Sequence, residues 1–429
     1  MKKTLYTQTE GGKGFYALLA GFGVIILAGM LGVLYMEHNG HWVTGMNNQI
    51  VWGMPHVFAI FLIVAASGAL NVASIGSVFG KKMYKPLAPL SGLLAIALLL
   101  GGLTILVLDL GRPDRLIVAM TEYNFKSIFA WNIYLYTGFF VIVGAYLWTM
   151  LYRPANKYGK GVGTFAFVWR LALTTGTGSI FGFLVARQGY DAALMAPMFI
   201  TFSFAYGLAI KILLLHGHST LNGMEIGNYI EKRLKNLLGI FVAASAYFTA
   251  VYHLTNLYGT ENHGYEAFIL LNGGIYTTLF WVGQVGIGYV LPLILLLLPN
   301  MGGSQKFNIL AGSVLIILGG MAQMYVTIIG GQAFPLQMFP GMEVTSSFAD
   351  GIVGAYSPSL PEFLLGIMGF ALALVIVLVL ARVFRIMPAT LADRVMDPHF
   401  SEPEPVQDDE ADEFNDDADD ADAANPATA

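Results

Sequence analysis

The sequence predicts an all-α fold, a polytopic membrane bundle of about ten transmembrane helices. Of its 429 residues, 56% are hydrophobic and only 11% are charged. The apolar residues form runs of about 20 residues or more, the length of helix that crosses a hydrocarbon layer of about 30 Å. Only helices satisfy their backbone hydrogen bonds within one segment in lipid, and the runs are too long and too uniformly apolar for barrel strands. A soluble globular fold is therefore excluded.

The apolar runs follow one another between a short basic N-terminus and an acidic tail. The first run is too long for the apolar core of a signal peptide and lacks a small-residue cleavage pattern at its end, so we expect it to be retained as a span. The ten spans are predicted at 15–36, 52–79, 87–109, 128–151, 165–187, 192–215, 237–257, 275–299, 307–329 and 361–386.

These spans divide the chain into three segments. Residues 1–14 are predicted to be a cytoplasmic N-terminus, and residues 15–395 to be a single transmembrane domain. Residues 396–429 contain the run DDEADEFNDDADDADAA, which is acidic and poor in apolar residues. Such a composition cannot bury enough apolar surface to fold, so this cytoplasmic tail is predicted to be disordered.

Lysine and arginine are distributed unevenly between the two sets of loops. One set, together with both termini, contains sixteen of these residues, whereas the alternate set contains four: Arg112, Arg115, Lys126 and Arg187. The positive-inside rule therefore places both termini in the cytoplasm and the alternate loops outside it.

The loop at 109–127 is an exception to this alternation. It holds three of the four basic residues on the outer side together with three acidic ones, and its LGRP motif predicts a proline-stiffened exit from the third span. Charges at a membrane boundary either anchor helix ends or form a site. We interpret this loop as the rim of a functional site.

Several polar side chains are predicted at a similar depth beneath this rim. Trp52 and His56 lie one turn apart where the second span begins, and Asp109 ends the third span. Trp52 is either an interfacial belt residue or a site residue. Asp109 either pairs locally with Arg112 at i+3 or acts as a site acid. His56 can donate a hydrogen bond and exchange protons near neutral pH.

A quinone head group requires donors for two carbonyl oxygens, an apolar slot and a nearby proton carrier. His56, Asp109, Arg112 and Asn124 supply these residue types. Bound haem is disfavoured, because only His56 and His253 are predicted to be membrane-embedded histidines and both lie at the same depth. No metal site is predicted. Cysteine is absent, which excludes disulfides, thiol catalysis and thiolate-ligated iron–sulfur clusters in this chain.

The inner half of the bundle contains two basic residues within spans, Arg170 and Lys211. Either their side chains snorkel to the headgroups or they belong to a proton or ion path. Thr174 and Thr177 line the same span as Arg170, and they favour either close helix packing or a hydrated proton route. Glu225 is either the entrance to that route or part of a solvated loop.

Three motifs resemble the NrfD/PsrC family of quinone-interacting membrane subunits of polysulfide-reductase-type redox complexes. They are Trp52–Gly53, the LGGLTILVLDLGRPDR segment that ends the third span, and the NFKSIFAWNIYLYTGFF segment that begins the fourth. The resemblance extends from about residue 15 to about residue 395. Within the family, the ten spans and the closing SPSLPEFLLGIMGFALALVIVLVLARVF are most similar to the P subunit of the sulfite-reductase-linked Dsr complex (DsrP).

The resemblance implies a subunit of the bacterial cytoplasmic (inner) membrane that is not catalytic alone. It would exchange electrons between menaquinone or ubiquinone and an extracytoplasmic ferredoxin-like iron–sulfur subunit, with a multihaem cytochrome and other membrane subunits as further expected partners in sulfur metabolism. Trp52, Asp109, Arg112 and Asn124 match the family motifs, whereas His56 is added from its own chemistry. Some relatives carry an acidic residue early in the fourth span, where this chain has Trp131 and Asn132.

Two other functions remain compatible with the residues. A secondary transporter is favoured by Arg170, Lys211 and the glycine-rich spans, but it would also require paired broken helices near mid-membrane, and the sequence shows no matched pair. A passive anchor for a peripheral redox protein would require only the charged outer loop.

Overall fold

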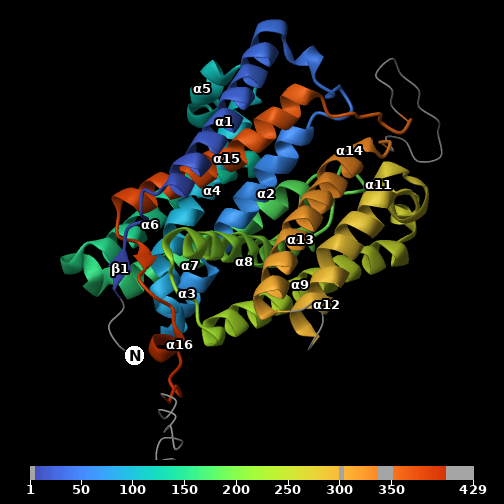
Figure 1. The fold of residues 1–429 in the computed structure, drawn as a ribbon. Helices are drawn as coiled ribbons and strands as arrows, with labels where there is room; N and C mark the ends of the chain where they lie inside the picture. Colours follow the sequence, from blue (N-terminus) through green and yellow to red (C-terminus); the bar gives the residue numbers. More distant parts are fainter. Residues whose placement is uncertain (1–4, 299–303, 337–350, 402–429) are drawn as a thin grey trace, which may run out of the picture.

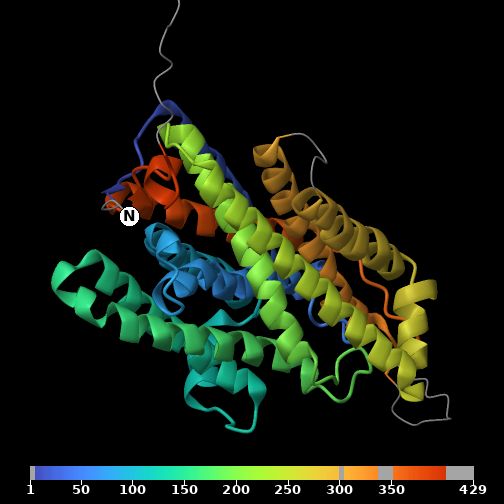
Figure 2. The same cartoon turned by 90° about the horizontal axis from the view of Figure 1, so that it is seen from below.

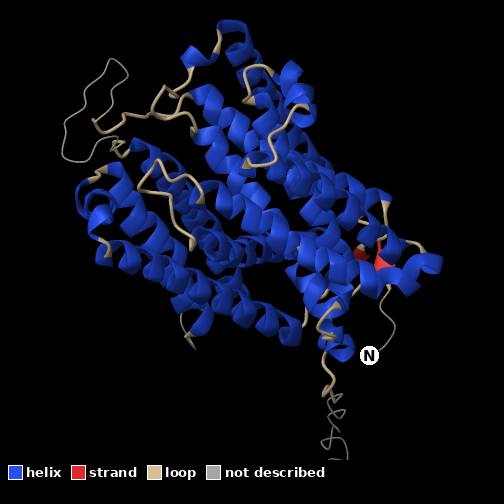
Figure 3. Cartoon of the chain, turned by 180° about the vertical axis from the view of Figure 1, so that it is seen from behind, coloured by secondary structure: helices blue, strands red, loops and turns tan. Residues whose placement is uncertain are grey.

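The structure is a computed structural model that describes residues 5–298, 304–336 and 351–401. Within these ranges the chain is almost entirely helical (Figures 1 and 3), and nine helices are long and apolar enough to cross a membrane. The predicted all-α membrane bundle is thus confirmed, and the chain is an integral membrane protein. Most of the tail predicted to be disordered, from residue 402 onward, lies outside the described residues.

The helices follow in the order of the predicted spans, with short turns of 3-10 or π-helix (η) between or within them. Their bounds, with those of the two short strands, are β1 Tyr6–Thr7, α1 Lys13–Asn39, η1 His41–Val43, α2 Met54–Ala69, α3 Asn71–Ser77, η2 Lys82–Leu87, α4 Ala88–Leu108, η3 Pro113–Arg115, α5 Leu116–Thr121, α6 Ile128–Leu151, η4 Arg153–Tyr158, α7 Gly159–Gly182, α8 Met195–Asn222, α9 Asn228–Tyr258, η5 Thr260–Asn262, α10 His263–Ala267, η6 Phe268–Asn272, α11 Ile275–Thr278, η7 Leu279–Val290, α12 Leu291–Leu297, α13 Gln305–Tyr325, η8 Val326–Gly330, α14 Gly331–Ala333, α15 Leu360–Val383, β2 Met387–Pro388 and α16 Asp393–Met396.

The predicted span at 165–187 corresponds to α7, which is not among the nine apolar helices of the described chain. Its 24 residues include Lys160, Arg170 and a run of threonines and glycines, which lower its hydropathy. It nevertheless packs against α6 on one side and α8 on the other. The other nine predicted spans each coincide with one of the nine apolar helices.

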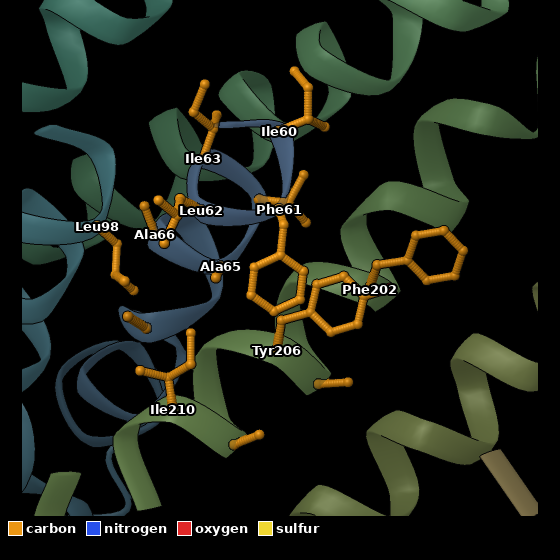
Figure 4. Packing of buried hydrophobic residues seen from close by; sticks show 14 of the residues in the cluster. Ile60, Phe61, Leu62, Ile63, Ala65, Ala66, Leu98, Phe202, Tyr206 and Ile210 are labelled. Atoms are coloured by element: carbon orange, nitrogen blue, oxygen red, sulfur yellow. The ribbon is translucent and has the colours of Figure 1, made fainter. Parts of the chain in front are cut away.

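Helix α2 lies at the centre of the bundle because its sequence is apolar on every side. Every residue from Val57 to Ala69 is buried, and the helix packs against α4, α7, α8, α13 and α15. A helix that is hydrophobic all round belongs in a core. Figure 4 shows Phe61 of α2 against Tyr206 of α8, with ring centroids 4.8 Å apart. Gly68 allows this approach, because a Cβ there would collide with the Ser203 carbonyl group of α8.

The peripheral helix α1 packs mainly along α15 and turns most of its surface outward. Near its start, β1 pairs antiparallel with β2 after α15, and Ile226 bridges to Leu391. These contacts gather the N-terminus and the segment after α15 at one end of the bundle (Figures 1 and 2). We call this end the inner face and the opposite end the outer face, following the predicted orientation.

Candidate functional site

A hollow of about 600 Å³ opens on the outer face, between the connection from α1 to α2 and the turn after α4. Its walls mix polar and apolar side chains, and they include the start of the loop that the sequence analysis identified as a rim. The lining residues are Met36, Glu37, Gly40, His41, Trp42, Met46, Asn47, Asn48, Val51, His56, Asp109, Leu110, Gly111 and Arg112.

His56 and Asp109 meet in this hollow, as predicted. His56 Nδ1 lies 3.1 Å from Asp109 Oδ2, and the side chains are 21% and 1% exposed, respectively. The distance is that of an ion pair, but the two groups are not aligned for a hydrogen bond. Nδ1 of His56 and both carboxylate oxygens of Asp109 therefore have no hydrogen-bond partner among the described residues.

Local structure explains why these two side chains converge. Pro55 occupies the first turn of α2, where its missing N–H costs nothing, so His56 projects from the outer end of that helix. Asp109 follows the last residue of α4. Gly111 then reverses the chain with φ of 67°, a conformation that favours glycine. A Cβ at Gly111 would contact the His41 ring at 3.4 Å, so the turn packs closely against that histidine.

His41 is a site residue that the sequence analysis missed. It lines the same hollow, and its Nε2 is buried without a hydrogen-bond partner among the described residues. Buried polar atoms are nearly always hydrogen-bonded in folded proteins, so unpartnered ones indicate a place for a ligand or solvent. The signal available in the sequence was a histidine in an outer loop without lysine or arginine.

Trp52 supports His56 from the side rather than lining the hollow. The two rings stack with centroids 6.2 Å apart and an interplanar angle of 29°. Phe129, Phe181 and Tyr190 surround the indole with centroid distances between 5.9 and 6.3 Å. Trp52 is thus partly buried in an aromatic cluster whose Phe129 is exposed, and both interpretations of Trp52 stay open.

Two buried side chains, Gln332 and Glu362, hold the backbone that begins α2. Gln332 Oε1 accepts from the N–H groups of Val51 and Trp52, and its Nε2 donates to the Trp52 carbonyl oxygen. The Met54 N–H donates to the Tyr356 hydroxyl, which in turn donates to Glu362. These bonds fix the segment immediately before His56, and the sequence analysis did not identify them.

Arg112 lines the hollow, as expected of a site residue, whereas Asn124 does not. Arg112 does not pair with Asp109; both its Nε and Nη2 donate to the Asp114 carboxylate at 3.1 Å. Because the chain reverses at Gly111, Arg112 turns towards solvent at the mouth of the hollow. Asn124 is not among the lining residues, and its Oδ1 accepts from the Lys126 N–H before α6.

Arg170 and Lys211 are both fully buried, so of their two interpretations the one in which the side chains snorkel to the headgroups was wrong. Arg170 Nη2 donates to Asn71 Oδ1 at 2.8 Å, and Lys211 Nζ donates to the Leu87 carbonyl oxygen and to Ser91. Their long side chains point between helices because α7 and α8 both pack against the early part of the chain.

The predicted proton path is only partly connected in the structure. Thr174 bonds both Ser67 and the Arg170 carbonyl oxygen, whereas the Thr177 hydroxyl bonds the backbone of its own helix. Within the described chain, no hydrogen bond joins this group to Lys211. Glu225 is exposed near Arg394 at 3.8 Å, which agrees with its interpretation as part of a solvated loop.

Two further histidine–carboxylate pairs lie elsewhere in the bundle. His253 Nδ1 is 2.7 Å from Glu266 Oε2, so this histidine is not simply interfacial. His216 Nε2 is 3.1 Å from Glu231 Oε1 near the inner face. Neither pair was predicted from the sequence. In the described ranges, no group of three or more His, Asp or Glu side chains is arranged to hold a metal ion.

Comparison with known proteins identifies similar membrane subunits. The family described as "Polysulphide reductase, NrfD" matches residues 42–336. The chain is 27% identical to the "Hdr-like menaquinol oxidoreductase integral membrane subunit" of Archaeoglobus fulgidus, over 87% of this chain and 95% of that protein. It is 22% identical to a selenate reductase subunit of Mesobacillus selenatarsenatis, over 82% of this chain and 90% of that subunit. It is also 25% identical to a polysulfide reductase chain of Wolinella succinogenes, over 67% and 96% of the two sequences.

Proposed function

Because this chain belongs to the polysulphide reductase NrfD family, we propose that it is the quinone-interacting membrane subunit of a redox complex. The substrate, menaquinone or ubiquinone in its oxidised or reduced form, binds in the hollow on the outer face. Three relatives are named as parts of a menaquinol oxidoreductase, a selenate reductase and a polysulfide reductase, which supports this assignment.

One observation carries the proposal: His56 and Asp109 present buried polar atoms to the hollow without aligned hydrogen bonds. A quinol has a hydroxyl at each end of its ring, which can donate to a carboxylate or imidazole, and the carbonyl oxygens of the oxidised form can accept from a histidine N–H. His41 Nε2 is a further such atom in the same hollow and would bind the substrate with them. The apolar part of the wall, which includes Met36 and Val51, is suited to the ring.

The pair also supplies the proton chemistry that quinol oxidation requires. Oxidation of a quinol to a quinone releases two electrons and two protons, and reduction reverses both. His56 takes one proton from the substrate hydroxyl, and Asp109, 3.1 Å away, stabilises the imidazolium that forms. Asp109 therefore acts through His56 as well as by contact with the substrate. The second proton leaves to solvent through the open mouth of the hollow. The Trp52 ring and the Gln332 hydrogen bonds keep His56 in position.

The electrons pass to or from another subunit, because a protein without cysteine cannot supply thiolate ligands to a cluster. We propose a ferredoxin-like iron–sulfur partner that docks over the outer face, in a complex of the Dsr type. The exposed apolar residues of α5, Ile117, Val118 and Met120, lie beside the exposed Arg112–Asp114 pair, and such a mixed surface supports a docking role.

The proposal is tested by titrating the purified protein in nanodiscs with a fluorescent quinol-analogue inhibitor and measuring quenching. Asp109→Asn and His56→Ala are each expected to weaken binding about tenfold or more, which is about 1.4 kcal/mol. Asp114→Asn removes a carboxylate from the rim but not from the hollow, and it should bind normally. Unchanged affinity in both site variants would favour a passive anchor, and solute uptake by the protein in liposomes would favour a transporter.

A further inference from the structure

A second hollow lies on the inner face, between α1, α8 and α15. It encloses about 140 Å³, and apart from Thr9 and His218 all its walls are apolar. Gly217 on α8 contributes to the space, because a Cβ there would meet no atom within 4 Å. The apolar lining residues are Leu18, Phe22, Leu214, Leu221, Leu374, Val377, Leu378, Ala381 and Met387.

His218 provides a single hydrogen-bond donor in this apolar hollow. Asn222 Oδ1 accepts from the Glu10 N–H at 2.6 Å, which fixes the orientation of the amide, so its Nδ2 is the atom 3.0 Å from His218 Nδ1. Nδ1 must therefore accept a hydrogen bond, and the ring proton lies on Nε2. The side chain is 6% exposed, and Nε2 has no hydrogen-bond partner in the described part of the chain.

The height of these groups in the bundle indicates what they bind. His218 lies four residues, or about 6 Å, from the inner end of α8. Arg382 is in the last turn of α15, and its exposed guanidinium donates to the Thr9 carbonyl oxygen at 2.9 Å beside the hollow. An apolar channel, a donor just inside it and a cation at the helix end correspond in order to the acyl chain, ester carbonyl and phosphate of a phospholipid.

We propose that this hollow binds one anionic phospholipid of the adjoining leaflet. The acyl chain lies between α1, α8 and α15, an ester carbonyl oxygen accepts from His218 Nε2, and the phosphate lies against Arg382. The lipid fills the gap that α1 leaves, because α1 packs along α15 but leaves this hollow between itself and α8. This site is independent of the quinone site proposed for the outer face.

Native mass spectrometry of the full-length protein, released from nanodiscs of equal parts phosphatidylglycerol and phosphatidylcholine, tests the proposal. The wild type should retain one phosphatidylglycerol. Gly217→Leu fills the hollow, and it should reduce that retention about tenfold, or about 1.4 kcal/mol. Gly21→Leu is the matched control, since Gly21 is exposed on α1 outside the hollow and also has open space around it.

A second pair of variants keeps the test decisive if Gly217→Leu does not fold. Arg382→Gln should remove the preference for phosphatidylglycerol over phosphatidylcholine, whereas Arg385→Gln, which removes an exposed charge three residues further on, should preserve it. Equal retention by the wild type and both site variants would overturn the proposal. So would a quinone, rather than a phospholipid, that copurifies with the wild type and is lost from Gly217→Leu.

Discussion

The pairs His56–Asp109 and His253–Glu266 contain the same two chemical groups but differ in how those groups are satisfied. Glu266 is fully buried, with one oxygen 2.7 Å from His253 Nδ1 and the other accepting from Asn256 at 2.8 Å. Asp109 is buried to a similar degree, but neither of its oxygens has an aligned hydrogen bond among the described residues. Both oxygens of Glu266 thus have partners within the fold, whereas those of Asp109 have no aligned partner among the described residues.

This difference distinguishes a structural pair from a candidate site. A satisfied buried pair holds its elements together, and removing one partner leaves an uncompensated group behind. A carboxylate and an imidazole that lack aligned partners contribute less to stability and remain available to a substrate. Access agrees with this assignment, because the hollow beside His56 and Asp109 measures about 600 Å³ and the one beside His253 about 20 Å³.

The largest expected effect is on turnover in Asp109→Asn. Loss of the charge that stabilises protonated His56 should lower quinol oxidation by the assembled complex about 10²- to 10⁴-fold, the usual contribution of a positioned acid–base group. The melting temperature should change little, because the carboxylate makes no aligned hydrogen bond within the described residues. Steady-state kinetics and thermal unfolding on the same preparation measure both. If Asp109→Asn lowers the melting temperature but keeps its turnover, the assignment of the two pairs would be reversed.

The opposite result is expected for Glu266→Ala. It leaves His253 and Asn256 buried without their partner, which should destabilise the fold by about 3–5 kcal/mol. Thermal unfolding in nanodiscs measures the loss, and quenching of the quinol analogue should be unchanged in the fraction that remains folded. If Glu266→Ala binds the analogue about tenfold more weakly at full stability, the satisfied pair belongs to a site after all.

The sequence predicted the spans well because hydropathy is a local property. The ends of the span at 128–151 coincide with α6, whose apolar run is bounded on both sides by polar residues. It also predicted that His56 and Asp109 meet, since each lies at the outer end of a span and consecutive spans pack as neighbours. Hydropathy does not say which side of an apolar helix faces protein, so the complete burial of Arg170 and Lys211 was not predictable.

The sequence could not predict contacts that depend on how loops and distant segments pack. Arg112 had two carboxylates within reach, Asp109 and Asp114, and the left-handed turn at Gly111 decided between them. His41 comes from a connection and Gln332 from the short helix α14, and the partners of both depend on tertiary packing. Gln332 reaches Trp52 across 280 positions of the chain, a separation over which local sequence patterns carry no information.

His41 offers a further test of this comparison, because its unpartnered Nε2 lies in the hollow beside His56 and Asp109 and not beside the other pair. His41→Ala should weaken binding of the quinol analogue about tenfold, as expected for loss of one hydrogen bond to a substrate oxygen. His38→Ala is the matched control, since His38 lies exposed in the last turn of α1 outside the hollow. Equal affinities in the two variants would restrict the site to His56 and Asp109.

The smallest effect is expected at the Arg112–Asp114 pair, which shares the rim with the site but is exposed on both sides. The hydrogen bonds from Arg112 lower the pKa of the Asp114 carboxyl below its usual value of 3.8. A carboxyl with a lowered folded-state pKa stabilises the fold above its unfolded pKa, and the contribution disappears as the pH falls through the folded value. Since an exposed pair is screened by solvent, neither Arg112→Gln nor Asp114→Asn should measurably change stability, and turnover should change less than about twofold.

NMR titration of the Asp114 carboxyl should show its pKa return to the usual value in Arg112→Gln but not in Arg115→Gln. A large loss of turnover in Arg112→Gln would mean that the rim arginine contacts the substrate.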